Sequence, residues 1–313
     1  MSSGVHFPGW TRFRPRRATR QSCDETAENL DGSPCSRDVA KFARTSKGVA
    51  GTESLGDFRY GWTTRGVLRL AAALLLGGVL SACAATPPPP SPDPRFAVGE
   101  ELVRDDFHAG LALWRTELAE GGTVEARDGV LEVDVPAGCS VWLAQPLEGP
   151  LLITYEATAV SAGGPNDRVS DLNCFWMAND ARSPGDLFAT ARTGVFGDYD
   201  QLRCYYVGYG GNANTTSRFR RYIGERGNRP LLPEHDLTGP ENLLVPNEPQ
   251  RIQLVAAGST IGFYHNGRRL FAYDDPAPYT RGGFAFRTVK SHLRIRDFRV
   301  HRLIPVAGPA VGP

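Results

Sequence analysis

The chain has 313 residues, with 35 lysines and arginines against 34 aspartates and glutamates, and a formal net charge of +1. This near-neutral balance argues against nucleic acid as a partner, because nucleic-acid binding needs a concentrated basic field. Glycine (35 residues) and proline (24) are abundant, which favours a domain of many short strands over one of long helices. No CxxC pair occurs, so the cysteines indicate no zinc site.

Residues 67–83 read VLRLAAALLLGGVLSAC, an apolar run of signal-peptide length that is too short to span a bilayer comfortably. The run ends in Leu-Ser-Ala-Cys, which resembles the lipobox of bacterial lipoproteins. That resemblance implies lipidation at Cys83 and a membrane anchor in the bacterial cell envelope, on the periplasmic or cell-surface side. Residues 84–95 are proline-rich and would form a semi-rigid tether. The alternative is a buried helix in a soluble protein.

Residues 1–66 are arginine-rich, polar and without periodicity, although a signal peptide belongs at the N-terminus. Two hypotheses remain open. Either translation starts later, near Val67, and the upstream stretch is a mis-called start, or the stretch is a disordered cytoplasmic arm. Residues 305–313 are expected to form a flexible tail.

Residues 96–304 carry alternating apolar and polar positions on the scale of strands. The surest element is IGFYHNGRRLFAY, because Asn266-Gly267 is the preferred pair for a two-residue hairpin turn. A second turn is expected at Asp128-Gly129, and no long amphipathic helix is evident. The sequence therefore predicts an all-β fold, an antiparallel β-sandwich of jelly-roll type. The expected strands cover residues 123–135, 140–145, 151–160, 171–178, 201–210, 217–224, 251–258, 260–275, 282–289 and 292–303.

Several stretches, DDFHAGLALW, GVLEVDV, DLNCFWMA, YYVGYGGN and GGFAFRTVKSHLRIRDFRVHRL, together resemble the concanavalin A-like jelly rolls. They are most similar to the uncharacterised YesU-like proteins of polysaccharide use, and the ending is similar to 3-keto-disaccharide hydrolase/lyase domains. The resemblance implies the fold and a carbohydrate ligand. The stretch Glu132-Val133-Asp134-Val135-Pro136 lacks the second glutamate of the related retaining endoglucanases, and the signature strands of alginate lyases are absent.

Strand alternation assigns residues to the two faces of the predicted sheet, because successive side chains point to opposite sides. Leu172, Cys174 and Trp176, and likewise Leu202, Cys204 and Tyr206, are expected in the core, with Phe219 also pointing inward. The opposite face would form a sugar-binding cleft with aromatic rings and polar groups, although an ordinary solvated sheet face is the alternative. The predicted substrate-binding residues are Asp171, Asn173, Arg203, Tyr205, Arg218, Arg220 and Tyr222.

Lys290 is the only lysine after Lys47, in a chain that uses arginine for 32 of its 35 basic residues. A lysine can serve as a base when its pKa falls, whereas arginine cannot. We therefore expect Lys290 or His292 to act as acid/base, with Arg287 beside them to neutralise a substrate carboxylate. The alternatives are that the lysine survives by chance and that the histidine is structural.

These residues predict a lipid-anchored, carbohydrate-active jelly roll, a lyase or hydrolase of an acidic or rhamnose-containing polysaccharide. The alternatives are a non-catalytic glycan-binding module and a structural envelope lipoprotein. No cofactor is expected, although Asp198, Asp200 and Asn212 are candidate ligands of a structural calcium ion. Cys174 and Cys204 would form either a disulfide or two buried thiols, leaving Cys139 unpaired.

Overall fold

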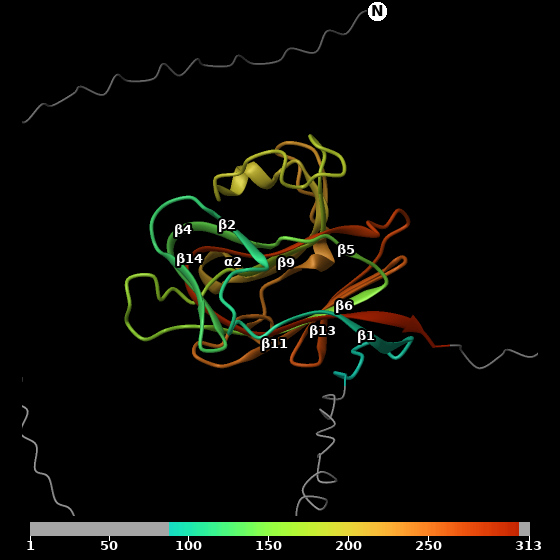
Figure 1. The fold of residues 1–313 in the computed structure, drawn as a ribbon, viewed down its shortest axis with the longest axis horizontal. Coiled ribbons are helices and arrows are strands. Elements are labelled where there is room, and N and C mark those ends of the chain that lie inside the picture. The colour runs from blue at the N-terminus through green and yellow to red at the C-terminus, as the bar shows by residue number, and fades with distance from the viewer. Residues whose placement is uncertain (1–87, 307–313) are drawn as a thin grey trace, which may run out of the picture. The chain divides into compact units, whose positions relative to one another are not determined.

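A computed structural model describes residues 88–306, which form an antiparallel all-β domain (Figure 1). The predicted signal peptide, Cys83, the arm at residues 1–66 and most of the predicted tail lie outside the described residues. Within residues 88–306 no helix has the length and apolarity needed to cross a membrane. The strands are β1 (Phe96–Asp105), β2 (Trp114–Leu118), β3 (Thr123–Arg127), β4 (Val130–Leu143), β5 (Leu147–Glu148), β6 (Leu151–Ala159), β7 (Leu172–Asp180), β8 (Leu202–Gly210), β9 (Thr216–Ile223), β10 (Asp236–Leu237), β11 (Gln250–Ala257), β12 (Thr260–His265), β13 (Arg268–Asp274) and β14 (Arg281–Pro305).

The last strand, β14, joins the two layers of the sandwich. Its first half pairs with β7 on one side and β4 on the other, and β8, β9 and β10 extend that layer. Its second half pairs with β6 and β1, and β11, β12 and β13 extend the other layer. The prediction of an antiparallel jelly-roll sandwich is thus confirmed. The two strands expected at 282–289 and 292–303 are one strand. The loop expected between them is replaced by a register shift at Lys290, which faces an extra residue of β4.

Both predicted hairpin turns are present. Asn266 and Gly267 have φ angles of 48° and 80°, and Asp128 and Gly129 have φ angles of 53° and 78°. Two consecutive positive φ angles are the signature of the turn that matches the right-handed twist of paired strands. Local sequence therefore determines both hairpins.

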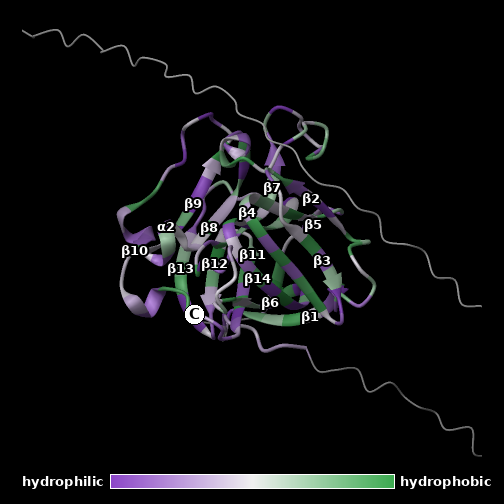
Figure 2. Cartoon of the chain, turned by 90° about the vertical axis from the view of Figure 1, so that its left-hand side faces the viewer, coloured by the Kyte–Doolittle hydropathy of each residue, from purple (hydrophilic) through white to green (hydrophobic). Residues whose placement is uncertain are grey.

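The main core lies between the two layers and is rich in aromatic rings. Trp114 stacks on Phe286 at 5.2 Å and meets the edge of Phe298 at 5.0 Å. The Trp114 indole N–H donates to Asp105 at 2.7 Å, which satisfies its polar atom inside the core. Figure 2 shows hydrophobic stretches along the strands of both layers, as a core closed from two sides requires.

A second apolar cluster lies on the outer face of the β7–β8–β9 layer. It is covered by residues 181–201, here called the covering segment, which connect β7 to β8. Figure 1 shows this segment in yellow beyond β2 and β4, on the side away from β11 and β13. Tyr199 of the segment stacks on Phe175 at 5.3 Å and on Trp142 at 6.3 Å. The face that the sequence suggested would be an open cleft is therefore half covered.

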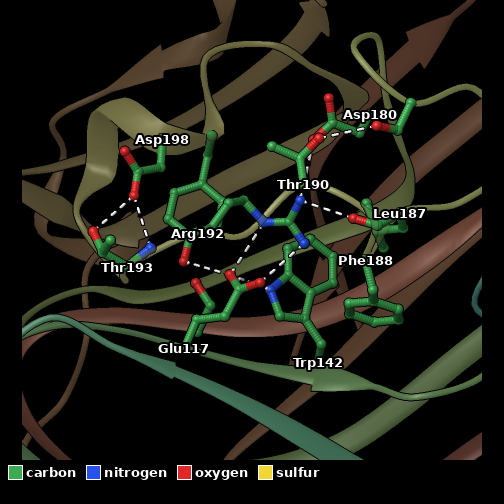
Figure 3. Close-up of polar contacts among 12 residues, drawn as sticks. Glu117, Trp142, Asp180, Leu187, Phe188, Thr190, Arg192, Thr193 and Asp198 are labelled. Carbon is green, nitrogen blue, oxygen red and sulfur yellow. Dashed lines mark hydrogen bonds and ion pairs between the residues drawn. The ribbon is translucent and has the colours of Figure 1, made fainter.

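A buried arginine fixes the covering segment to the sheet (Figure 3). Arg192 has no exposed side-chain surface and pairs with Glu117 of β2 at 2.9 Å and with Asp180 of β7 at 3.1 Å. Glu117 also accepts hydrogen bonds from the Trp142 indole and the Tyr199 hydroxyl, each at 2.8 Å. Every charge in the network thus has a partner, which a buried charge requires.

The cysteine alternatives are resolved in favour of free thiols. Cys174 points into the main core and Cys204 into the second cluster, so a sheet separates them. Cys139, Cys174 and Cys204 are all buried and unbonded. Burial raises the pKa of the Cys174 thiol to about 12, which keeps it protonated and unreactive.

We expect Arg192→Ala to lower the free energy of unfolding by about 3 kcal/mol, because it leaves the partly buried Glu117 carboxylate without a cation. The buried Asp180 loses one of its two arginine partners and keeps Arg182. The matched control is Arg127→Ala, which breaks an exposed pair with Glu125 at 3.4 Å and should cost less than about 1 kcal/mol. Urea denaturation measures both. Equal losses in the two variants would contradict the anchoring role of Arg192.

Candidate functional site

A groove of about 650 Å³ remains open on the outer face of the β7–β8–β9 layer, beside the covering segment. We call it the arginine groove. Its volume falls in the range of small-molecule sites. It crosses the strands in the order β9, β8, β7 and β14. Its lining residues are Arg168, Asp171, Asn173, Phe196, Tyr206, Gly208, Gly211, Asn212, Thr216, Arg218, Arg220, Gly227, Arg229 and Val289.

Three of the four groove arginines have acidic partners within the protein. Arg168 pairs with Asp171 at 2.7 Å. Arg218 contacts the Asp236 carboxylate through two nitrogens, at 2.8 and 3.1 Å. Arg229 pairs with Asp200 at 3.1 Å. These pairs hold the arginines in place and offset most of their charge.

Arg220 differs from the other three, because no salt bridge within residues 88–306 involves it. Its one hydrogen bond goes to the carbonyl oxygen of Arg229. Burial is the first cause that lowers the pKa of Arg220, and the neighbouring positive charges of Arg218 and Arg229 lower it further. A half-buried cation without an anion is costly, so the groove is electrostatically complementary to an anionic ligand.

The floor of the groove carries one buried polar atom that has no partner among residues 88–306 and suits a neutral part of a ligand. Asn173 is only 2% exposed, and its Oδ1 has no hydrogen-bond partner among residues 88–306. Asp171 has a left-handed backbone, with φ of 60°, and accepts hydrogen bonds from Ser170 and Arg168. Strained backbone at a non-glycine residue often accompanies a functional site.

The predicted positions of Asp171, Asn173, Arg218 and Arg220 on this face are confirmed, since all four line the groove. Tyr222 is on the same face but fully buried, packed against Tyr206 at 5.4 Å. It supports the floor and makes no contact with the open space.

The predicted assignment of β8 side chains to the two faces of the sheet is wrong. Tyr205 points into the main core, where its hydroxyl donates to Asp275 at 2.7 Å, and Arg203 lies on that same side, near Arg221. Tyr206, assigned to the core, instead lines the groove. Because the covering segment buries the outer face as well, both sides of β8 are apolar and alternation cannot identify the inner one.

Arg287 faces the predicted side of the sheet but is only 1% exposed. Its guanidinium donates to the Gly194 carbonyl of the covering segment at 2.6 Å and lies 4.9 Å from the centre of the Tyr199 ring. Its position is that of a support for the covering segment, beneath the surface that a ligand reaches.

Lys290 is exposed and lies opposite the bulge of β4, with φ of 45°, immediately after the groove residue Val289. Its side chain is not part of the groove lining. Its predicted role as a base therefore requires it to reach over the rim.

His292 lies outside the groove, between two carboxylates. Its Nδ1 is 2.8 Å from Asp167 and its Nε2 is 2.7 Å from Glu132. Both ring nitrogens are thus engaged by carboxylates, and neither faces the groove. Asp167 directly precedes Arg168, whose side chain enters the groove. The geometry thus makes His292 a positioning residue for that loop.

The candidate calcium ligands do not come together. Asp198 binds the backbone N–H and hydroxyl of Thr193, Asp200 pairs with Arg229, and Asn212 lies in the groove. Within residues 88–306 no group of three or more His, Cys, Asp or Glu side chains is arranged to hold a metal ion.

Strand alternation did not identify four further residues of the groove, which are Arg168, Phe196, Tyr206 and Arg229. Three of them come from loops, where alternation carries no information. A usable signal was the concentration of Phe188, Phe196 and Tyr199 between two strands, because aromatic side chains in a connection need a surface to cover.

We expect Glu132→Gln to reduce stability at pH 7 by on the order of 1 kcal/mol, since the residue pairs with His292 at the protein surface. The hydrogen bond from His292 is the first cause that lowers the Glu132 pKa, so the ionised form stabilises the fold. That contribution is present above the unfolded-state pKa of about 4.3 and is lost as the pH falls through the lower folded-state value.

The measurement is urea denaturation of wild type and variant between pH 7 and pH 2. The gap between them should close in acid. The exposed residue Glu125 of β3 supplies the control, and Glu125→Gln should show little difference at any pH. A gap for Glu132→Gln that is constant across the range would refute the assignment.

Comparison with solved structures agrees with the fold. The chain is similar to a protein of unknown function with a galectin-like fold from Bacillus subtilis, at 20% identity over 67% of this chain and 100% of that chain, with a TM-score of 0.53. More distant likenesses are to an endo-beta-1,3-glucanase from Pyrococcus furiosus (10% identity, 68% and 100% covered, TM-score 0.43) and to beta-agarase A from Zobellia galactanivorans (10%, 71% and 98%, 0.44).

A search of curated proteins finds no match. A protein-family model does match, over residues 133–298, which run from β4 through the covering segment and the groove to the second half of β14. The chain therefore belongs to the family described as Domain of unknown function (DUF6250).

Proposed function

We propose that the arginine groove binds an acidic glycan through a sugar carboxylate. The observation that carries this proposal is Arg220, a half-buried guanidinium without an acidic partner among residues 88–306. Guanidinium groups bind carboxylates through two parallel hydrogen bonds, which add geometric specificity to charge. Three of the four groove arginines pair with aspartates, so the one positive charge left for an anion is that of Arg220.

The remaining groove residues suit a sugar. The unpartnered Oδ1 of Asn173 accepts a hydroxyl hydrogen, and Asn212 and Thr216 add polar atoms at the other side of the groove. The Phe196 and Tyr206 rings, 5.9 Å apart, supply apolar surface for the C–H face of a pyranose. The resemblance to YesU-like polysaccharide-utilisation proteins agrees with this ligand class.

Binding without cleavage is favoured over hydrolysis. Glycoside hydrolysis uses two carboxylates on either side of the scissile bond, and Asp171 is the only carboxylate among the described residues that line the groove. Burial raises the pKa of Tyr206 well above its usual value, so its hydroxyl stays protonated and does not serve as a base.

Elimination on a uronate is the second candidate. The position of Lys290, next to Val289 on the groove rim, favours it. An arginine-bound carboxylate would lower the cost of removing the C5 proton, which the lysine in its neutral form would accept. The C4–C5 double bond would form as the C4–O glycosidic bond breaks, and the departing oxygen would take a proton from water.

Arg220→Ala tests the binding proposal. We expect its affinity for oligogalacturonates in calorimetric titration to fall about tenfold to a hundredfold, since a hydrogen bond to a charged group contributes about 1.5–3 kcal/mol. Stability should be unchanged or higher, because no buried anion is left behind. Wild-type affinity should also weaken with added salt.

Arg203→Ala is the matched control, because Arg203 is exposed and lies outside the groove. It should bind as the wild type does. The proposal would be contradicted if Arg220→Ala bound oligogalacturonates as tightly as the wild type does. It would also be contradicted if the wild type bound neutral glucans as tightly as oligogalacturonates. The same mixtures, followed for unsaturated product with wild type and Lys290→Ala, separate binding from elimination.

We also propose that the protein is held at a bacterial envelope membrane by lipid on Cys83, with residues 84–95 as its tether. The support is the lipobox-like LSAC sequence and the proline run after it. In detergent phase partitioning, Cys83→Ser should move the expressed protein from the detergent phase to the aqueous phase. Cys139→Ser, a change at a free thiol of the folded domain, should not. An aqueous wild-type protein would contradict the anchor.

A further inference from the structure

The arginine groove occupies only part of the sheet face, and it stops at β14. Its residues follow the strands in the order β9, β8, β7 and β14, ending at Val289. A long glycan lying across the strands would have to continue over the next strand, β4. The residue of β4 that pairs with Val289 is Gly138.

The covering segment lies directly on β4 at that position. A Cβ atom on Gly194 of the segment would lie 2.7 Å from the Gly138 carbonyl oxygen and 2.5 Å from the backbone nitrogen of Ala119. The two backbones are therefore in contact, which only glycine permits. No sugar ring fits between the segment and the strand.

Side chains close the same end of the groove. Arg168 donates to the Val289 carbonyl oxygen at 2.6 Å and to Asp171 at 2.7 Å, so it bridges the loop before β7 to the middle of β14. Phe196 of the covering segment lines the groove beside them.

The wall beside the groove is also fixed. The loop after β9 is tied to the covering segment, because Asp200 accepts a hydrogen bond from the Gly227 backbone at 2.9 Å and pairs with Arg229 at 3.1 Å. The segment itself is held by the buried contacts of Arg192 and by the Arg287 bond to Gly194. Lifting the covering segment would separate the buried charges of the Arg192 ion pairs. The segment is therefore a fixed wall of the groove and does not open.

From this geometry we infer that the groove receives the end of an acidic glycan chain and excludes chain interiors. This inference rests on the proposed function and adds to it the part of the polymer that is recognised. Arg168 and Asn173 lie toward the closed β14 end, so a terminal uronate would place its hydroxyls there. Arg220, on β9 at the other end of the groove, would bind a carboxylate on the side where the chain leads outward.

The test keeps the mass of polygalacturonate constant and changes only the number of chains. Partial cleavage into about ten pieces per chain should raise the number of binding sites about tenfold, because a chain-end site counts ends whereas an interior site counts sugar units. Sites are counted by calorimetric titration of the intact protein, with neutral dextran cleaved in parallel as the control.

The chain-end inference is overturned if the number of binding sites stays constant or falls on cleavage. If Arg220→Ala still weakens binding in that case, the acidic-glycan proposal stands. Absence of binding to polymer and fragments alike overturns the proposed function itself. The two failures are thus distinguishable.

Discussion

The ion pairing of Arg192 with Glu117 and Asp180 is the interaction on which the functional face depends. The covering segment contains aspartates and glycines as well as three aromatic residues, so its position on the sheet depends on both charge pairing and stacking. The buried arginine supplies charge pairing, and Tyr199 supplies stacking on Trp142 and Phe175. Because removing one partner of a buried pair costs more than the pair contributes, the covering segment stays closed and divides the face of the sheet into a filled part and an open part.

The chemistry of the open part follows from the unequal pairing of its four arginines with carboxylates. Arg168, Arg218 and Arg229 pair with carboxylates and act mainly as fixed walls. Arg220 sits among them without such a partner, and its neighbours make its environment still more positive. A site of this kind costs the folded protein some stability, which a bound anion would return. Strain at Asp171 and the unpartnered oxygen of Asn173 in the same groove point to the same trade of stability for binding.

The long strand β14 connects this site to the rest of the sandwich. Its first half forms part of the groove layer and its second half belongs to the other layer, with a register shift at Lys290 between them. Past this shift, His292 holds Asp167 and Glu132 and so fixes the loop that delivers Arg168. Lys290 and His292 looked catalytic because they were unusual in the sequence. The structure gives both a second explanation: Lys290 shapes the rim of the groove, and His292 braces a loop beside it.

The sequence by itself determined most of the strands, though not β1 and β2, and also the Asn266-Gly267 and Asp128-Gly129 turns and the jelly-roll class. These features depend on local φ preferences and on alternation along one strand. It also placed Asp171, Asn173, Arg218 and Arg220 on one face correctly. Only the tertiary structure decided which β8 side chains point inward, the burial of Arg287 and the extent of the groove. The physical reason is that the covering segment packs a second apolar layer onto the outer face. Once both faces of a strand are buried, its apolar pattern no longer says which face is inside, and long-range contacts decide.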